Sequence, residues 1–135
     1  MIGIIDYNMG NLASVYNACK LIDADATIVK NPEDLKKFNR VILPGVGAYK
    51  DAMEHLVQTG MNEAVYEFAK TGKPMIGICL GMQLLFESSQ EFGHSDGLGL
   101  IDGHVIKFDK SKMHEDFKIP HMGWNTIKNK ENPLF

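Results

Sequence analysis

The segment from residue 75 to residue 86, Met-Ile-Gly-Ile-Cys-Leu-Gly-Met-Gln-Leu-Leu-Phe, constrains the fold of this chain more than any other. Its first four residues suit a buried strand, and apolar residues recur after Cys79 at helical spacing. Gly77 and Gly81 flank the cysteine, as in a sharp strand-to-helix turn where larger side chains would collide with the neighbouring elements. We therefore expect a strand, a tight turn that presents the Cys79 thiol outward, and a helix.

Three further apolar runs, at residues 1–6, 26–29 and 41–43, are typical of short strands, and each is followed by a turn signal. Apolar residues return at helical spacing after the first run, and helices are expected at 51–58 and 61–70. The strand-like runs contain few polar residues, which is typical of strands covered by helices on both faces. This order predicts an α/β fold with an open, mostly parallel sheet, helices on both faces and right-handed crossovers.

The region after the turn helix gives a weaker pattern. Residues 87–99 are polar and glycine-rich, and residues 105–108 and 124–127 look like strands added in antiparallel fashion. Residues 131–135 place a turn signal before two apolar side chains, with no further element to bury them. We therefore expect residues 1–135 to form one domain whose C-terminal part is missing.

Composition argues against several classes of function. The chain has 135 residues and a formal charge of −3 with scattered basic residues, so nucleic acid is not expected as a partner. No apolar run approaches the roughly twenty residues that span a bilayer, so no membrane partner is expected. Two cysteines make no disulfide framework, and no leader precedes the first strand, so the expected location is cytoplasmic. The five histidines lack the paired spacing of a metal site, so no metal is expected.

Two interpretations of Cys79 stay open, a small buried hydrophobe and a nucleophile. At the first turn of a helix, free N–H groups and the positive end of the helix dipole would favour the thiolate over the thiol. Cys19 differs, because it lies on the apolar stripe of the first helix with no adjacent glycine. We interpret Cys19 as a packed thiol.

The loop Pro44-Gly45-Val46-Gly47 follows the third expected strand, at the edge of the sheet where open α/β folds gather their sites. Its glycines leave backbone N–H groups free to face a ligand. Acyl-transfer chemistry requires such donors where negative charge develops on an attacked carbonyl. A simple tight turn is the alternative for the loop taken alone.

Two other segments combine unusual residues. The segment Asp6-Tyr7-Asn8-Met9-Gly10-Asn11 could hold a phosphate at a helix start, but it lacks the three-glycine dinucleotide pattern. Asn11 is most simply a helix N-cap. The segment Pro120-His121-Met122-Gly123-Trp124-Asn125 fits core packing and a partner-facing patch equally well.

These four motifs together resemble a known family. Gly77-Ile78-Cys79-Leu80-Gly81-Met82-Gln83 and Pro44-Gly45-Val46-Gly47 are similar to motifs of the class I, or triad-type, glutamine amidotransferases. The segments at 6–12 and 120–125 look like those of the glutaminase subunits of imidazole glycerol phosphate synthases. The motifs occur in the same order over essentially the whole chain. The resemblance implies a flavodoxin-like amidotransferase fold and no cofactor.

The resemblance also implies a mechanism. Cys79 would attack the side-chain carboxamide of glutamine, release ammonia and leave a glutamyl thioester that water hydrolyses. The N–H of Leu80 would form the oxyanion hole with one N–H from the loop, and this loop would reorient when the partner is loaded. The loop residues concerned are Gly45, Val46 and Gly47.

By the same resemblance, Gly47, Gln83 and Glu91 would hold glutamine. The ammonia would pass to a (β/α)8-barrel synthase subunit, the expected partner in a heterodimer. That subunit would make imidazole glycerol phosphate and an aminoimidazole carboxamide ribotide in histidine biosynthesis. The residues that would face the barrel are Gly10, Asn11 and Trp124.

One departure from the family pattern affects activity. The family completes its triad with a His-Pro-Glu segment after the Trp motif, and none of the five histidines here is followed by Pro-Glu. Loss of the base from a comparable serine triad costs about a millionfold in kcat. We therefore expect residues 1–135 alone to show negligible glutaminase activity and, with apolar surface uncovered, self-association or marginal stability. Two alternatives stay open: a catalytically incompetent partner-binding module, and a paralogue that gives ammonia to a sugar-modifying synthase.

Overall fold

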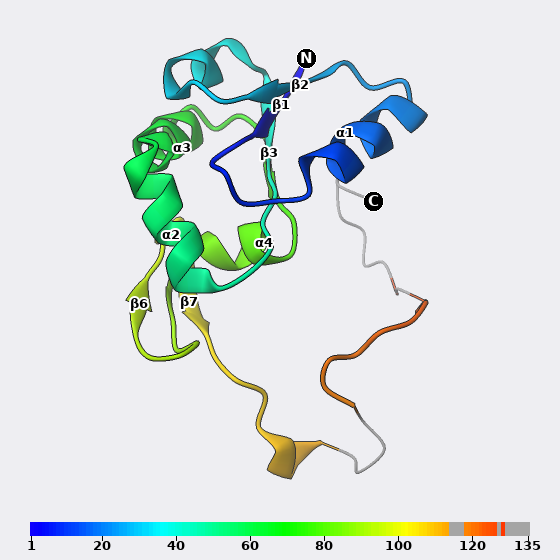
Figure 1. Cartoon of the computed structure of the whole chain (residues 1–135), viewed down its shortest axis with the longest axis vertical. Helices are drawn as coiled ribbons and strands as arrows, with labels where there is room; N and C mark the ends of the chain where they lie inside the picture. Colours follow the sequence, from blue (N-terminus) through cyan, green and yellow to red (C-terminus); the bar gives the residue numbers. More distant parts are fainter. Residues whose placement is uncertain (114–117, 127, 129–135) are drawn as a thin grey trace.

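A computed structural model of the chain describes residues 1–113, 118–126 and 128. Its main sheet has four parallel strands in the order β2-β1-β3-β4 (Figure 1). These strands are β1 (Ile2–Ile5), β2 (Ala26–Val29), β3 (Arg40–Leu43) and β4 (Met75–Gly77). The apolar runs therefore form the predicted parallel sheet. The order reverses between β1 and β3, and ligand sites of open α/β sheets gather outside the carboxyl ends of strands at such a point.

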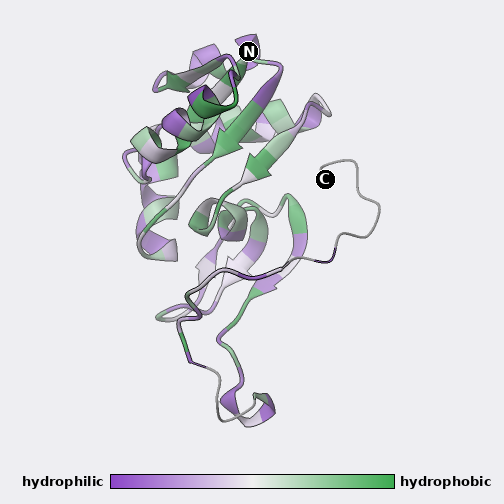
Figure 2. Cartoon of the chain, turned by 90° about the vertical axis from the view of Figure 1, so that its right-hand side faces the viewer, coloured by the Kyte–Doolittle hydropathy of each residue, from purple (hydrophilic) through white to green (hydrophobic). Residues whose placement is uncertain are grey.

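Helices lie on both faces of this sheet, as predicted (Figure 1). On one face α1 (Leu12–Leu21) packs against β1 and β2. On the other face lie α2 (Tyr49–Gln58), α3 (Met61–Lys70) and a 3₁₀ helix, η1 (Pro32–Lys37), which the sequence pattern did not predict. Figure 2 shows the strands of this main sheet as mainly hydrophobic and the helices as mixed, which fits strands enclosed between amphipathic helices.

The larger hydrophobic core lies between the sheet and the second group of helices. Successive side chains of a strand point to opposite faces, so alternate residues of β1 and β3 enter this core. The residues that contribute include Ile5, Val41, Leu43, Leu56 and Val65, each almost fully buried.

The opposite face carries one isoleucine from each strand. Ile28, Ile4, Ile42 and Ile76 are register partners across the four strands. Ile4 is fully buried, whereas Ile76 is 48% exposed. Because α1 packs against β1 and β2, it leaves Ile76 on β4 about half exposed, in line with the expected exposed apolar surface.

The structure differs from the prediction after Cys79. The turn helix α4 (Leu80–Leu84) has five residues and does not continue to Phe86. Phe86 instead begins β5 (Phe86–Ser89), the central strand of a second sheet in the order β6-β5-β7. The other two strands are β6 (Ser95–Asp96), antiparallel to β5, and β7 (Ile101–Val105), parallel to it. The polar region 87–99 therefore contains sheet that its composition did not indicate.

The strand expected at 105–108 is wrong except for its first residue. Val105 ends β7, and the exposed Ile106 and Phe108 have no partner strand among the described residues, although their apolar side chains favoured one. A short 3₁₀ helix, η2 (Lys110–Lys112), follows. The strand expected at 124–127 is also wrong for residues 124–126, and residue 127 lies outside the described residues. Within the described parts of the chain, no helix is both long and apolar enough to cross a membrane.

Candidate functional site

Cys79 occupies the turn between β4 and α4, as the sequence predicts. Its backbone has φ 55° and ψ −116°, a region that residues other than glycine seldom occupy. Such strain persists only where the surrounding structure enforces it, and it clusters at functional sites. The thiol is free and exposed, so the interpretation of Cys79 as a buried hydrophobe is wrong.

The two glycines that flank Cys79 are required by close approach. A Cβ placed on Gly81 would overlap the Leu43 carbonyl oxygen, and a Cβ on Gly77 would lie 2.5 Å from the Cα of Met82. Both obstacles are backbone atoms, which cannot move aside as a flexible side chain can. The Gly-x-Cys-x-Gly spacing therefore lets α4 pack directly against β3 and β4, with the thiol at the bend between them.

The first turn of α4 leaves one amide free beside the thiol. The N–H groups of Met82 and Gln83 both donate to the Cys79 carbonyl, at 3.0 and 3.2 Å. The N–H of Leu80 has no hydrogen-bond acceptor within the described part of the chain. This N–H is the predicted oxyanion donor, and Leu80 as a whole is 3% exposed.

The segment Pro44-Gly45-Val46-Gly47, which we term the oxyanion loop, lies next to this turn. Gly45 is buried, and a Cβ placed on it would lie 2.6 Å from the Gly81 nitrogen and 3.0 Å from the Leu80 Cβ. Two motifs more than thirty residues apart in the sequence are thus in contact. This contact favours a role for the loop in the Cys79 site over the alternative of a simple tight turn.

The exposed half of the oxyanion loop is free to meet a ligand. Val46 is 51% exposed, and Gly47 is exposed with φ 95°, in the left-handed region that favours glycine. The N–H groups of Gly45, Val46 and Gly47 have no acceptor among the residues that the structure describes. The predicted donors from the loop and from Leu80 therefore border the same turn.

The start of the loop is held by Tyr7, for which the sequence pattern predicted no role in the site. The buried Tyr7 hydroxyl donates to the Pro44 carbonyl oxygen at 2.9 Å. Burial raises the pKa of Tyr7, so the phenol stays protonated and remains a donor. The sequence shows a tyrosine in a turn-rich segment, but no spacing rule predicts its burial or connects it to a partner 37 residues away.

Two of the three residues predicted to hold glutamine line one pocket. Gln83 and Glu91 border a pocket of about 520 Å³, together with the backbone and side chains that follow β5 and β7. The Glu91 carboxylate accepts a hydrogen bond from the Tyr49 N–H at 2.8 Å, and Tyr49 lies two residues after Gly47. The fold therefore brings Gln83 and Glu91 to one pocket, whereas Gly47 and Cys79 do not line it. The Tyr49 N–H links Glu91 to the segment that follows Gly47.

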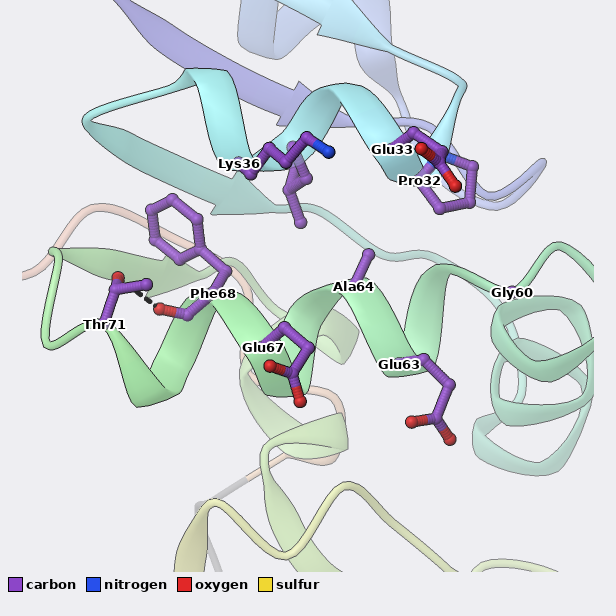
Figure 3. Close-up of a pocket in the computed structure, with 10 residues that line it drawn as sticks. Pro32, Glu33, Lys36, Gly60, Glu63, Ala64, Glu67, Phe68 and Thr71 are labelled. Carbon is purple, nitrogen blue, oxygen red and sulfur yellow. Dashed lines mark hydrogen bonds between the residues drawn. The ribbon is translucent and has the colours of Figure 1, made fainter.

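Another pocket, of about 570 Å³, lies between η1 and α3 (Figure 3). Its apolar floor includes Leu35 and Phe68, and Figure 3 shows Phe68 pointing from α3 toward η1. Charged residues from both helices stand at its edge. None of the predicted site residues lines this pocket, so it does not belong to the candidate acyl-transfer site.

The residues predicted to face a partner lie in two regions. Asn11 caps α1 as expected, because its side-chain oxygen accepts from the Ser14 N–H at 3.2 Å. Gly10 lies against the oxyanion loop, since a Cβ on it would be 3.3 Å from the Pro44 Cγ. Trp124 is fully exposed, at 104%, so the core-packing interpretation of its segment is wrong.

The described residues supply no base for Cys79. His94, His104 and His121 hydrogen-bond to Asp96, Ser88 and Asn125, and no described histidine bonds to the Cys79 sulfur. Cys19 is 6% exposed in α1, which confirms the packed thiol. Among the described residues no three His, Cys, Asp or Glu side chains form a group that could hold a metal ion.

Comparison with known protein sequences relates this chain to one family. The family model "Glutamine amidotransferase class-I" matches residues 3–135. The chain is 62% identical over 135 residues to the imidazole glycerol phosphate synthase subunit HisH of Wolinella succinogenes, covering 99% of this chain and 66% of that protein. It is 60% identical to the HisH subunit of Sulfurimonas denitrificans, covering 100% of this chain and 65% of that protein. The chain therefore spans just under two thirds of the length of these curated relatives.

Solved structures show the same fold at lower identity. A crystal structure of a glutamine amidotransferase superposes with a TM-score of 0.66 at 21% identity, covering 78% of this chain and 55% of that one. A putative peptidase E from Listeria monocytogenes EGD-e superposes with a TM-score of 0.57 at 15% identity, covering 74% of this chain and 62% of that one. These likenesses show the predicted α/β fold.

Proposed function

Because the chain belongs to the class I glutamine amidotransferase family, we propose that it carries the nucleophile of a glutaminase subunit of imidazole glycerol phosphate synthase. The observation that carries the proposal is the geometry of Cys79. The backbone of Cys79 has φ 55° and its thiol is exposed, and the N–H of the next residue, Leu80, has no acceptor among the described residues. A nucleophile and an oxyanion donor on one strained turn suit acyl transfer.

In the proposed reaction the Cys79 thiolate adds to the carboxamide carbon of glutamine, and the carbonyl oxygen takes the negative charge. The Leu80 N–H and one N–H of the oxyanion loop donate to this oxygen, and each such donor is worth about 3 kcal/mol in the transition state. The C–N bond then breaks, and the nitrogen leaves as ammonia after it takes a proton. Water hydrolyses the remaining thioester to glutamate and returns the thiol.

The general acid and base of this cycle come from outside the described residues. In the proposal a histidine from a His-Pro-Glu segment, which the 135 residues do not contain, passes the proton to the departing nitrogen. Gln83 and Glu91 bind the polar head of glutamine in the pocket that they line, with the Glu91 carboxylate facing the ammonium group. Gly47 contributes backbone without a side chain that would obstruct the substrate.

The proposed partner is a (β/α)8-barrel synthase subunit in a heterodimer, and the ammonia passes to it through a channel. There the nitrogen enters imidazole glycerol phosphate in a lyase-type step of histidine biosynthesis. The fully exposed Trp124 supports a partner surface, since tryptophan is enriched among residues that anchor interfaces. Gly10 and Asn11 complete the proposed contact. Both cysteines are free, which suits the reducing cytoplasm as the proposed location.

The test uses the full-length gene product together with its barrel partner and glutamine labelled with ¹⁵N in the carboxamide. The expected result is ¹⁵N in imidazole glycerol phosphate, abolished by Cys79→Ala and retained by Cys19→Ala. Added ammonia should restore synthesis in Cys79→Ala, since the barrel itself is unchanged. A glutamine analogue with an electrophilic ketone in place of the carboxamide should label Cys79.

The alternatives predict different outcomes in the same experiment. A partner-binding module without chemistry would form the complex but show neither labelling of Cys79 nor release of glutamate. A paralogue for a sugar-modifying synthase would release ammonia without forming imidazole glycerol phosphate. Either result would contradict the proposed function.

A further inference from the structure

We propose that Glu91 is a positioning residue for the oxyanion loop, because its carboxylate caps α2 and so holds the end of the loop beside Cys79. This inference rests on the proposed function and adds a role to a residue that would otherwise only bind substrate. It depends on one hydrogen bond between segments that lie 42 residues apart, from the Tyr49 N–H to the Glu91 Oε2 at 2.8 Å.

The start of α2 needs an acceptor from elsewhere, because the residue that precedes the helix supplies no capping side chain. The first N–H groups of a helix have no partners within the helix, and a preceding Ser, Thr, Asp or Asn usually accepts one of them. The residue at this position is Ala48, and its side chain makes no capping hydrogen bond. Glu91 supplies the missing acceptor from another segment, and its negative charge also suits the positive end of the helix dipole.

The oxyanion loop lies between two such anchors. At its start, the Tyr7 hydroxyl holds the Pro44 carbonyl at 2.9 Å. Just past its end, the Tyr49 N–H is held by Glu91, and the Tyr49 side chain is fully buried. Val46 and Gly47 between these anchors are exposed, so the two anchors, together with the packing of Gly45 against Gly81 and Leu80, hold the loop N–H groups in place.

Glu91 is itself oriented by a buried group. Its N–H donates to the Ser89 Oγ at 3.0 Å, and Ser89, at the end of β5, is fully buried. Glu91 also lines the pocket that contains Gln83. One carboxylate therefore joins the wall of the proposed glutamine pocket to the loop that would stabilise the oxyanion.

The experiment separates positioning from binding of the substrate ammonium. Variants Glu91→Ala and Glu91→Gln are made in the full-length gene product with its synthase partner. Glu54→Gln serves as the matched control, because Glu54 is an exposed carboxylate on the same helix, 4.0 Å from Lys50. Glutamate release from glutamine is compared with hydrolysis of 5-amino-5-oxopentanoate, which is glutamine without its α-amino group.

For a positioning residue, Glu91→Ala should lower kcat by about tenfold or more for both substrates, since small misplacements of catalytic groups cost that much. Glu91→Gln keeps an acceptor for the Tyr49 N–H, so its kcat should lie within about threefold of the unmodified complex. Its KM for glutamine should stay as high as that of Glu91→Ala, because the carboxylate that faces the substrate ammonium is absent from both. A loss confined to glutamine, with the deamino substrate unaffected, would overturn the positioning role and leave only ammonium binding.

A second readout does not depend on turnover. Hydrogen exchange at the Tyr49 amide should speed up by about tenfold or more in Glu91→Ala and little in Glu91→Gln or Glu54→Gln. Unchanged exchange in Glu91→Ala would overturn the inference. If the unmodified complex shows no Cys79-dependent glutaminase, the proposed function fails and this inference fails with it. If that activity is present and the Glu91 variants match the control, only the positioning role fails.

Discussion

Replacement of Tyr7 by Phe, with Tyr49→Phe as the matched control, tests how the start of the oxyanion loop is held. Both tyrosines are fully buried. The Tyr7 hydroxyl donates to the Pro44 carbonyl at 2.9 Å, whereas the Tyr49 hydroxyl has no hydrogen-bond partner in the described part of the chain. The same chemical change therefore removes a hydrogen bond in one variant and an unpaired polar atom in the other.

Tyr7→Phe should lower the free energy of unfolding, whereas Tyr49→Phe should leave it unchanged or raise it. Tyr7→Phe leaves the buried Pro44 carbonyl without its donor, which costs about 1–3 kcal/mol. Tyr49→Phe removes a hydroxyl that is desolvated without compensation, so its effect should lie between neutral and about 1 kcal/mol stabilising. The expected difference between the variants is about 2 kcal/mol, with Tyr7→Phe the less stable.

Urea unfolding of the full-length gene product, followed by circular dichroism, measures this difference. The slope with denaturant should not change, because neither variant alters the surface exposed on unfolding. Equal stabilities, or a lower stability for Tyr49→Phe, would refute the assignment of the Tyr7 hydroxyl as the anchor of the loop.

Three further predictions follow from the same geometry. Gly81→Ala should lower the free energy of unfolding by more than about 3 kcal/mol, because its Cβ would overlap the Leu43 carbonyl. Gly72→Ala, at φ 69° with no atom near the added Cβ, should lower it by about 1 kcal/mol. Equal losses of stability in thermal unfolding would contradict this prediction. Burial raises the pKa of both Tyr7 and Tyr49 above the ordinary value of 10.0. Stability should therefore hold below pH 10 and fall as pH rises toward the raised values, less steeply in Tyr7→Phe, and parallel alkaline unfolding profiles would argue against it. A polypeptide limited to residues 1–135 should release no measurable glutamate, and Cys79-dependent turnover would disprove this. It should also self-associate through the sheet face around the exposed Ile76, and a monomer in analytical ultracentrifugation would disprove that.

The sequence alone determined the four parallel strands, the three longer helices and the turn at Cys79. These features are local: apolar runs of strand length, helical spacing and the glycines beside Cys79 lie within a few residues of one another. The same local character explains why the loop at 44–47 and the N-cap at Asn11 could be predicted. For such features, a short stretch of chain contains the whole physical cause.

Only the tertiary structure decided how the candidate site is held together. The Tyr7 hydrogen bond to Pro44 and the Glu91 cap on α2 join residues 37 and 42 positions apart, and no periodicity reports such contacts. The end of α4 at Leu84 and the strand at Phe86 were mispredicted for the same reason, because pairing with β7 outweighed local helical spacing. Exposure of Trp124 likewise depends on what packs around it. Long-range contacts set these features, since the free energy that fixes them comes from neighbours in space and not in sequence.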